Sequence, residues 1–227
     1  PRKDMATEAL NPSQFIKDFL LTFITFFRKK SILASILFLL LYRFAEGQLV
    51  KIASLFLLDS EGHGGLALTT AEVGFVYGTV GVLALLFGGI LGGFLAARHG
   101  LKFWIWWMVV AMNLPNVVYV FLSLYLPDSI LVVYGAVAIE QFGYGLGFTA
   151  YMLYMLYFAQ GEHETAHYAI CTGFMALSMM VPGAISGWLQ ELIGYQHFFV
   201  WILIATIPSF LVVYFLRIDP EFGKKST

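Results

Sequence analysis

The stretch SILASILFLLLYRFAEGQLVKIASLFLL, residues 31–58, decides the fold of this protein. Its length exceeds the about 20 mostly apolar residues that an α-helix needs to cross a bilayer. Three charged residues, Arg43, Glu46 and Lys51, nevertheless lie inside it. A charged side chain at bilayer depth costs at least about 2.5–3.5 kcal/mol. The stretch is therefore predicted to be a membrane helix whose charges face a partner or a water-filled cavity.

The composition of the whole chain agrees with a membrane protein. Of 227 residues, 59% are hydrophobic and 12% are charged, whereas soluble domains are about 25% charged. The net charge of -1 gives no reason to expect a nucleic-acid partner. The sequence has no glycine-rich phosphate loop, and we expect no cofactor. The chain starts on Pro1, so we expect it to be a piece of something longer.

Six segments are long and apolar enough to span a membrane, and short polar turns separate them. They are residues 31–58, 71–97, 103–126, 130–158, 166–193 and 198–216. We therefore predict an all-α, polytopic membrane protein with a cytoplasmic linker at residues 1–30, a six-helix transmembrane half-domain at 31–217 and a cytoplasmic tail at 218–227.

The positions of Lys and Arg predict the orientation. If the six segments alternate, every Lys and Arg except Arg43 and Lys51 falls on one side of the membrane. Cytoplasmic flanks are enriched in these residues. We therefore expect both ends of the chain to be cytoplasmic.

The linker carries a helical pattern of its own. Phe15, Phe19, Phe23 and Phe26 recur at helical spacing and are followed by Arg28, Lys29 and Lys30. An amphipathic helix lying in the membrane interface explains this pattern. A helix packed on the cytoplasmic end of the bundle explains it equally well.

The six segments also predict an internal repeat. The third and sixth contain a mid-helix proline, Pro115 or Pro208, the second and fifth are rich in glycine, and the first and fourth carry intramembrane charge, including Glu140. Because three is odd, the second triplet is inverted relative to the first. Inverted three-helix repeats are typical of transporters. Glycines four residues apart predict close helix contacts, and Pro182 with Gly183 is a candidate hinge.

A loop motif points to a known family. GGFLAARHGLK, residues 92–102, resembles the loop G-x-L-A-D-R-x-G-R-K of the major facilitator superfamily. The residues that match the pattern are Gly93, Ala96, Arg98, Gly100 and Lys102, while Ala97 and Leu101 depart from it. The candidate gating residues are Gly93, Arg98, Gly100 and Lys102.

Within this superfamily, the chain is most similar to the C-terminal six helices of the muropeptide permease (AmpG-type) family and its acetyl-CoA transporter relatives. The stretches that carry the resemblance are residues 39–59, 69–93 and 164–199. The resemblance implies a secondary active transporter of the bacterial inner membrane that works by alternating access, and no enzyme. It also implies an N-terminal six-helix half as partner, beside the lipid bilayer, a small anionic solute such as a muropeptide, and protons. Another solute, such as acyl-CoA, a sugar or a drug, is the alternative.

The intramembrane charges are the candidate site. Counting about 1.5 Å per residue from the outer helix ends places Glu140 between Lys51 and Glu46 in depth, so all four charges can meet. We predict proton-coupling roles for Glu46 and Glu140. The predicted substrate-binding residues are Arg43, Lys51, Tyr144, Tyr151 and Tyr154, because Arg binds two anion oxygens at once and tyrosines stack on sugars. The alternative is a set of internal ion pairs that neutralise one another.

One motif suggests a different class of protein. HETAH, residues 163–167, fits the zinc-protease pattern H-E-x-x-H. It falls in a cytoplasmic turn, where we expect Thr165 to cap the next helix, and a third ligand is missing. An intramembrane zinc protease is therefore the weaker alternative, and we expect no metal.

Overall fold

The computed structural model describes the backbone of residues 12–225 and the side chains of residues 20–225. Within these residues the chain is helical, as predicted, with no strand. The helices are α1 (Pro12–Phe27), α2 (Ile32–Leu41), α3 (Phe44–Leu58), α4 (Thr70–Phe75), α5 (Val82–His99), α6 (Leu101–Asn113), α7 (Val117–Tyr125), α8 (Ile130–Ala159), α9 (Glu164–Ala205) and α10 (Ile207–Tyr214). Three short turns of 3-10 or π geometry join them: η1 (Glu61–His63), η2 (Val76–Gly81) and η3 (Leu114–Asn116).

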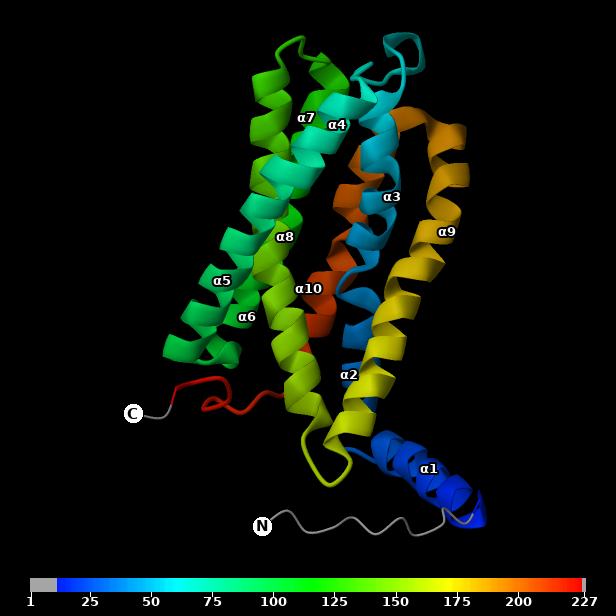
Figure 1. Ribbon diagram of the computed structural model, residues 1–227, viewed down its shortest axis with the longest axis vertical. Helices are drawn as coiled ribbons and strands as arrows, with labels where there is room; N and C mark the ends of the chain where they lie inside the picture. Colours follow the sequence, from blue (N-terminus) through cyan, green and yellow to red (C-terminus); the bar gives the residue numbers. More distant parts are fainter. Residues whose placement is uncertain (1–11, 226–227) are drawn as a thin grey trace.

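Five helical segments are long and apolar enough to cross a membrane. They are Ile32–Leu58, Thr70–His99, Leu101–Tyr125, Ile130–Ala159 and Glu164–Tyr214. The first four match the predicted segments to within a few residues. The fifth has 51 residues, and its backbone leaves helical geometry at Gly194, where φ is 75° and ψ is 166°. The chain reverses direction there (Figure 1), because glycine tolerates a positive φ that other residues resist.

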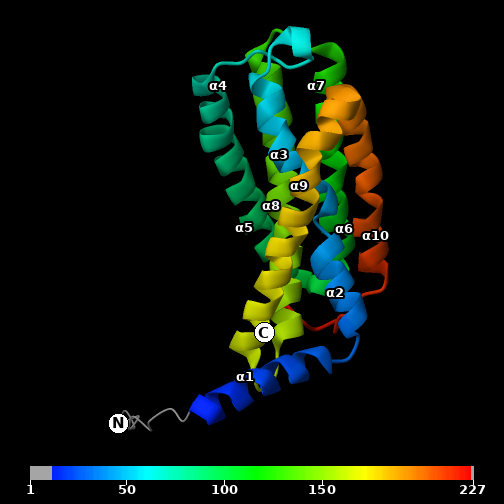
Figure 2. The same cartoon turned by 90° about the vertical axis from the view of Figure 1, so that its right-hand side faces the viewer.

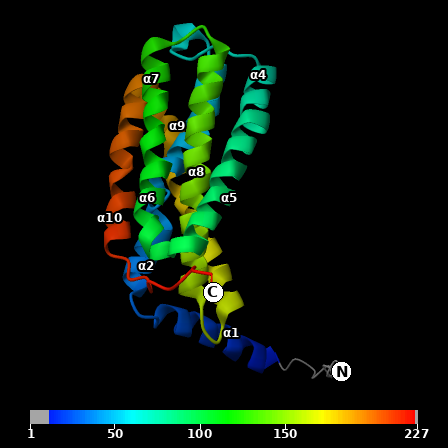
Figure 3. The same cartoon turned by 90° about the vertical axis from the view of Figure 1, so that its left-hand side faces the viewer.

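The two ends of the bundle differ in charge. The α5–α6 turn, the α8–α9 loop, α1 and the C-terminal segment all lie at the lower end of the bundle (Figures 1 and 3). This end carries every Lys and Arg of residues 20–225 except Arg43 and Lys51. The predicted charge asymmetry is therefore present among the described side chains, while Arg2, Lys3 and Lys17 lie outside them.

Helix α1 forms as predicted and crosses the lower end of the bundle (Figure 2). Its last turn is packed: Phe26 is fully buried and its ring contacts Phe158 and Phe174. Leu20, Leu21, Phe23 and Ile24 are exposed. Phe15 and Phe19 lie outside the described side chains. The C-terminal end of α1 thus docks on the bundle, and its interfacial location stays a prediction.

Several membrane segments are interrupted near their middle. The first breaks at Tyr42 and Arg43, which separate α2 from α3. The second contains the π-helical turn η2, and the third contains η3 around Pro115. Proline lacks the N–H that continues a helix, and π turns often mark functional sites.

Glycines make the closest helix contacts. A Cβ on Gly145 would meet the carbonyl oxygen of Leu85 on α5 at 2.1 Å, and one on Gly143 would meet that of Ala111 on α6 at 2.0 Å. Gly88 and Gly92 of α5 pack against α8 in the same way. The close contacts predicted from glycines four residues apart are confirmed for Gly88, Gly92 and Gly143, whereas Gly145 lies outside that spacing and Gly74, Gly78, Gly93 and Gly187 have open space around them. These contacts make α8 the central helix of the bundle.

The C-terminal segment is docked on the bundle. Ile218 is buried, and the ring of Phe222 contacts that of Tyr157 on α8, with centroids 4.8 Å apart. The carbonyl of Phe222 accepts a hydrogen bond from the Leu101 N–H, at 3.0 Å, in the α5–α6 turn. Residues 218–225 of the predicted tail therefore pack on the base of α5, α6 and α8.

Candidate functional site

Arg43 lies at the break in the first membrane segment, where it directly precedes α3. Its side chain is buried, with 6% of the residue exposed. The guanidinium donates a hydrogen bond to the Tyr144 hydroxyl on α8. Its Cζ lies 4.9 Å from the ring centroid of Phe148, 5.4 Å from that of Tyr144 and 5.9 Å from that of Tyr151. Aromatic faces attract cations, so α8 supplies an aromatic cage for Arg43.

Two buried carboxyl groups extend the site from this arginine: Glu46 lies within electrostatic range of Arg43, and Glu140 lies within electrostatic range of Glu46. Glu46 follows it by one helical turn on α3, and Glu140 comes from α8, with exposures of 4% and 2%. The two carboxyls are close enough to interact electrostatically, and Glu46 also interacts with Arg43. Glu46 Oε2 has no hydrogen-bond partner among the described residues, and neither does Arg43 Nε.

The alternative interpretation, a set of neutralising ion pairs, finds no close pair among the described residues. Within residues 20–225 the salt bridge found within 4 Å is Lys224–Glu221, at the lower end of the bundle. Arg43 interacts with Glu46 only beyond that distance, because the break before α3 directs its guanidinium toward the rings of α8. A buried arginine without a close carboxylate retains donors for another anion.

Lys51 does not join the cluster, contrary to the expectation that all four charges converge. It is exposed, and its aliphatic stem lies against Gly183 of α9. Lys51 lies more than a helical turn beyond Glu46, on a side of α3 that faces α9 and not α8. The depth count did not take account of the direction in which the Lys51 side chain points.

Three residues that sequence reasoning missed complete the carboxyl site. Gln141 Nε2 donates to Glu140 Oε2 at 2.9 Å, and the Tyr119 hydroxyl, on α7, donates to the same oxygen at 3.4 Å. The Tyr77 hydroxyl, on η2, is 2.8 Å from the Tyr119 hydroxyl. Gln141 could have been noticed beside Glu140. Tyr77 and Tyr119 come from other helices, and no linear pattern connects them to Glu140.

The predicted tyrosine stripe divides into two roles. Tyr144 is half-buried and contacts Arg43. The Tyr151 hydroxyl donates to the Leu39 carbonyl at 2.7 Å, and the Tyr154 hydroxyl is 2.7 Å from Ser35 Oγ. Both partners lie on α2. In this conformation Tyr151 and Tyr154 connect α8 to α2 through hydrogen bonds. Tyr144 is the tyrosine of the stripe whose side chain stays partly exposed.

The loop motif lies at the lower end of the bundle, and the hinge candidate lies at a contact between two helices. Gly93, Arg98 and Lys102 are exposed at the lower end. Gly100 has a φ of 85° and a Cβ there would meet the Pro220 carbonyl oxygen at 2.8 Å. Pro182 and Gly183 pack against Gly47 of α3, and α9 continues through them without non-helical backbone. Gating and hinge motion stay predictions.

The HETAH motif forms no metal centre among the described residues. The rings of His163 and His167 lie 5.9 Å apart, and no third His, Cys, Asp or Glu is grouped with them. His167 Nε2 lies 3.1 Å from Thr25 Oγ1 on α1 and 3.2 Å from the Thr22 carbonyl oxygen. The expected cap is wrong: α9 begins at Glu164 with His163 as N-cap, so Thr165 is already helical.

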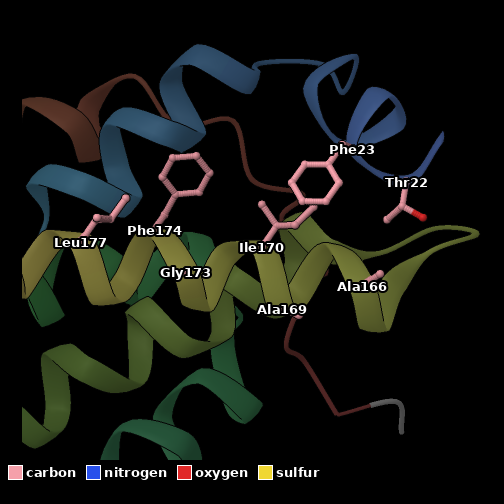
Figure 4. A pocket seen from close by; sticks show the side chains of 8 residues that line it. All are labelled: Thr22, Phe23, Ala166, Ala169, Ile170, Gly173, Phe174 and Leu177. Carbon is pink, nitrogen blue, oxygen red and sulfur yellow. The ribbon is translucent and has the colours of Figure 1, made fainter. Parts of the chain in front are cut away.

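A cavity of about 510 Å³ lies between α1 and the first part of α9. Figure 4 shows its wall of apolar side chains, among them Phe23, Ile170, Phe174 and Leu177. No ionisable residue lines it. This cavity is thus separate from the cluster of Arg43, Glu46 and Glu140, which we take as the candidate site.

The geometry defines a class of protein. A buried arginine at an interrupted membrane helix, together with two buried carboxyls in the same bundle interior, is costly in a bilayer and is typical of membrane proteins that move solutes or ions. The described chain is thus a helical integral membrane protein with an intramembrane charged site.

Comparison with known proteins narrows this class. The chain is 29% identical over 182 residues to "Putative transporter AmpG 1" of Rickettsia felis, which covers 80% of the chain and 40% of that protein. It is 25% identical to "Putative transporter AmpG 2" of Rickettsia prowazekii over 198 residues. This aligned region covers 87% of the chain and 47% of that protein. No family model matches the chain.

These relatives confirm the resemblance to AmpG-type permeases. Their names agree with the expectation that the protein is not an enzyme. The chain spans less than half the length of these two relatives, 40% and 47%.

Proposed function

We propose that the chain is one half of a secondary active transporter that takes up an anionic solute together with protons by alternating access. The observation that carries this proposal is Arg43, a buried guanidinium at a helix break with no carboxylate within 4 Å among the described residues. Helix breaks of this kind commonly form substrate sites in transporters. The similarity to named transporters supports the proposal.

The proposed architecture is six membrane helices in two inverted triplets, the C-terminal half of a major facilitator fold. The reversal at Gly194 supports it, because it divides the 51-residue segment into two opposed parts. Breaks at matching places, η3 in the third segment and Thr206 between α9 and α10, support the repeat. An N-terminal six-helix half is the proposed partner that closes the site.

In the proposed mechanism Arg43 holds an anionic group of the solute. Four of the five guanidinium N–H donors remain beyond the bond to Tyr144, and Tyr144 is placed to stack on a sugar ring. Lys51, exposed on α3, attracts the anion before it reaches Arg43. Tyr151 and Tyr154 belong to the wall of this path.

Glu46 or Glu140 is the proposed proton carrier. An anion bound at Arg43 adds negative charge beside Glu46, and this favours protonation of the carboxyl pair. Solute and proton would then move together. Tyr119 and Gln141 position Glu140 through their hydrogen bonds to Oε2.

The proposed setting is a bacterial inner membrane with the lysine-rich end in the cytoplasm. Gly93, Arg98, Gly100 and Lys102 would then form a cytoplasmic gating loop, and Pro182 with Gly183 the hinge. A muropeptide is the proposed solute.

Uptake by the full-length protein in proteoliposomes tests the proposal. Wild-type protein should accumulate a muropeptide when a proton gradient is imposed. Glu140→Gln should abolish accumulation yet leave exchange down a solute gradient, whereas Glu191→Gln, at an exposed position, should behave as wild type. Gradient-driven accumulation by Glu140→Gln would remove Glu140 from the coupling site, and no uptake of any anionic solute by wild type would overturn the proposal.

A further inference from the structure

Another cavity, which is polar and has a volume of about 440 Å³, opens at the lower end of the bundle. It is enclosed by the α1–α2 turn, the C-terminal end of α8 and Arg217, three residues beyond the end of α10. Its lining residues are Lys29, Lys30, Ser31, Ser35, Tyr154, Tyr157, Phe158, Gln160 and Arg217. Three cations line this cavity, and no carboxylate is among its lining residues.

The three cations are differently engaged. Lys29 Nζ donates to the carbonyl oxygens of Phe158 at 2.5 Å and Gln160 at 2.8 Å, which holds it against the end of α8. Partial burial lowers the pKa of Lys29. Lys30 and Arg217 are exposed and have no ion-pair partner among the described residues. The two free cations therefore point to an anion in this cavity.

Backbone geometry at Ser31 adds to this preference. Ser31 has a φ of 59° and serves as the N-cap of α2, but its side chain makes no capping hydrogen bond. The first turn of α2 has no acidic residue. The start of α2 therefore carries no carboxylate, although the Ile32 N–H donates to the Lys29 carbonyl at 3.3 Å, and helix N-termini favour anions.

An apolar groove of about 490 Å³ adjoins this cavity on the outer face of α2 and α10. Ser31 and Arg217 line both. The remaining lining residues are Leu33, Ala34, Leu37, Val212 and Phe215. The groove extends from the charged end toward the apolar middle of α2. A cationic pocket continuous with an apolar groove matches a headgroup with its acyl chain, whereas a soluble anion would use the pocket alone.

We propose that these two cavities form one binding site for an anionic phospholipid, with the phosphate at Lys30 and Arg217 and an acyl chain between α2 and α10. The excess of three cations over carboxylates favours a lipid with net negative charge over a zwitterionic one. Because Ser209 Oγ donates to the Tyr42 carbonyl at 2.8 Å, α10 is tied to α2 at the break beside Arg43. A lipid held between these helices would therefore influence the position of α2 at the same break.

Native mass spectrometry of the full-length protein with defined lipids tests the site. Phosphatidylglycerol should be retained in preference to phosphatidylcholine with the same acyl chains. A Lys30→Gln, Arg217→Gln variant should weaken phosphatidylglycerol retention about 30-fold, at about 5-fold for each cation. The matched control removes two exposed cations of the same end that line neither cavity, Lys224→Gln with Lys225→Gln, and should bind as wild type.

A groove variant separates a lipid from a free anion. Ala34→Trp fills the groove and should weaken phosphatidylglycerol retention without changing the binding of inorganic phosphate; Ala34→Leu is the milder variant if Ala34→Trp does not fold. The proposal would be overturned if the control and the Lys30→Gln, Arg217→Gln variant lost phosphatidylglycerol retention equally. Equal retention of phosphatidylcholine would also overturn it, and so would displacement of the lipid by millimolar inorganic phosphate, which would indicate a soluble-anion site.

Discussion

Replacing Arg43 by Gln separates a solute-binding arginine from a structural one. The guanidinium makes one side-chain hydrogen bond, to Tyr144, and lies over three aromatic rings within 5.9 Å. If a solute anion binds it, truncation of this buried charged partner should cost at least about 2 kcal/mol of binding free energy. That corresponds to an increase in KM of at least about 30-fold.

Arg43→Lys gives an intermediate expectation. Lysine keeps the charge within the aromatic cage but offers a point charge in place of a planar fork. The loss of one charge-assisted hydrogen bond, worth at least about 1.5 kcal/mol, should raise KM about tenfold. Lys225→Gln, which removes an exposed charge outside the cluster, should leave KM unchanged.

Initial uptake rates in proteoliposomes over a range of solute concentrations, together with thermal unfolding in detergent, provide the measurement. No carboxylate within 4 Å loses its partner in Arg43→Gln, so the free energy of unfolding should change by less than about 1 kcal/mol. The reasoning is refuted if KM stays at the wild-type value while the unfolding temperature falls. Arg43 would then act only in packing α8.

Three further predictions concern the neighbourhood of α8. Gly145→Ala places a Cβ 2.1 Å from the Leu85 carbonyl oxygen and should lower the free energy of unfolding by about 1–3 kcal/mol. Gly135→Ala has open space around it and should leave the free energy of unfolding unchanged. Equal thermal stability of the two variants would contradict the glycine contact. Tyr119→Phe removes the hydroxyl between Tyr77 and Glu140 and should shift the pH profile of uptake. Tyr134→Phe should leave this pH profile unchanged. Identical profiles of the two variants would exclude Tyr119 from positioning Glu140. Phe222→Ala removes the ring contact with Tyr157 and should speed proteolysis of the C-terminal segment relative to Lys225→Ala. An unchanged rate would show that this ring contact does not hold the segment.

Much of the fold was predictable because a bilayer imposes simple rules. Apolar length located the membrane segments to within a few residues, and the positions of Lys and Arg predicted that the α5–α6 turn and the C-terminal segment share one end. The predicted segments 166–193 and 198–216 fall on either side of Gly194, where the chain reverses. These features depend on composition along the chain, which the sequence displays directly.

The candidate site was only partly predictable. Arg43, Glu46 and Glu140 were found because charge in an apolar run is conspicuous. The arrangement of these side chains was not predicted. It depends on the break at Tyr42 and Arg43, which turns the guanidinium toward the rings of α8. Lys51 was placed in the cluster by depth, yet its side chain faces Gly183 of α9.

The sequence by itself determined a helical membrane protein, its segments, its charged end and the three buried charges. Hydropathy and charge act residue by residue, so they can be read along a single chain. Only the tertiary structure decided which side chains meet: the cage around Arg43, the Tyr77–Tyr119–Glu140 chain and the basic cavity beside the α2–α10 groove. These sites join residues from separate helices, and their contacts depend on helix rotation and local breaks that no linear pattern specifies.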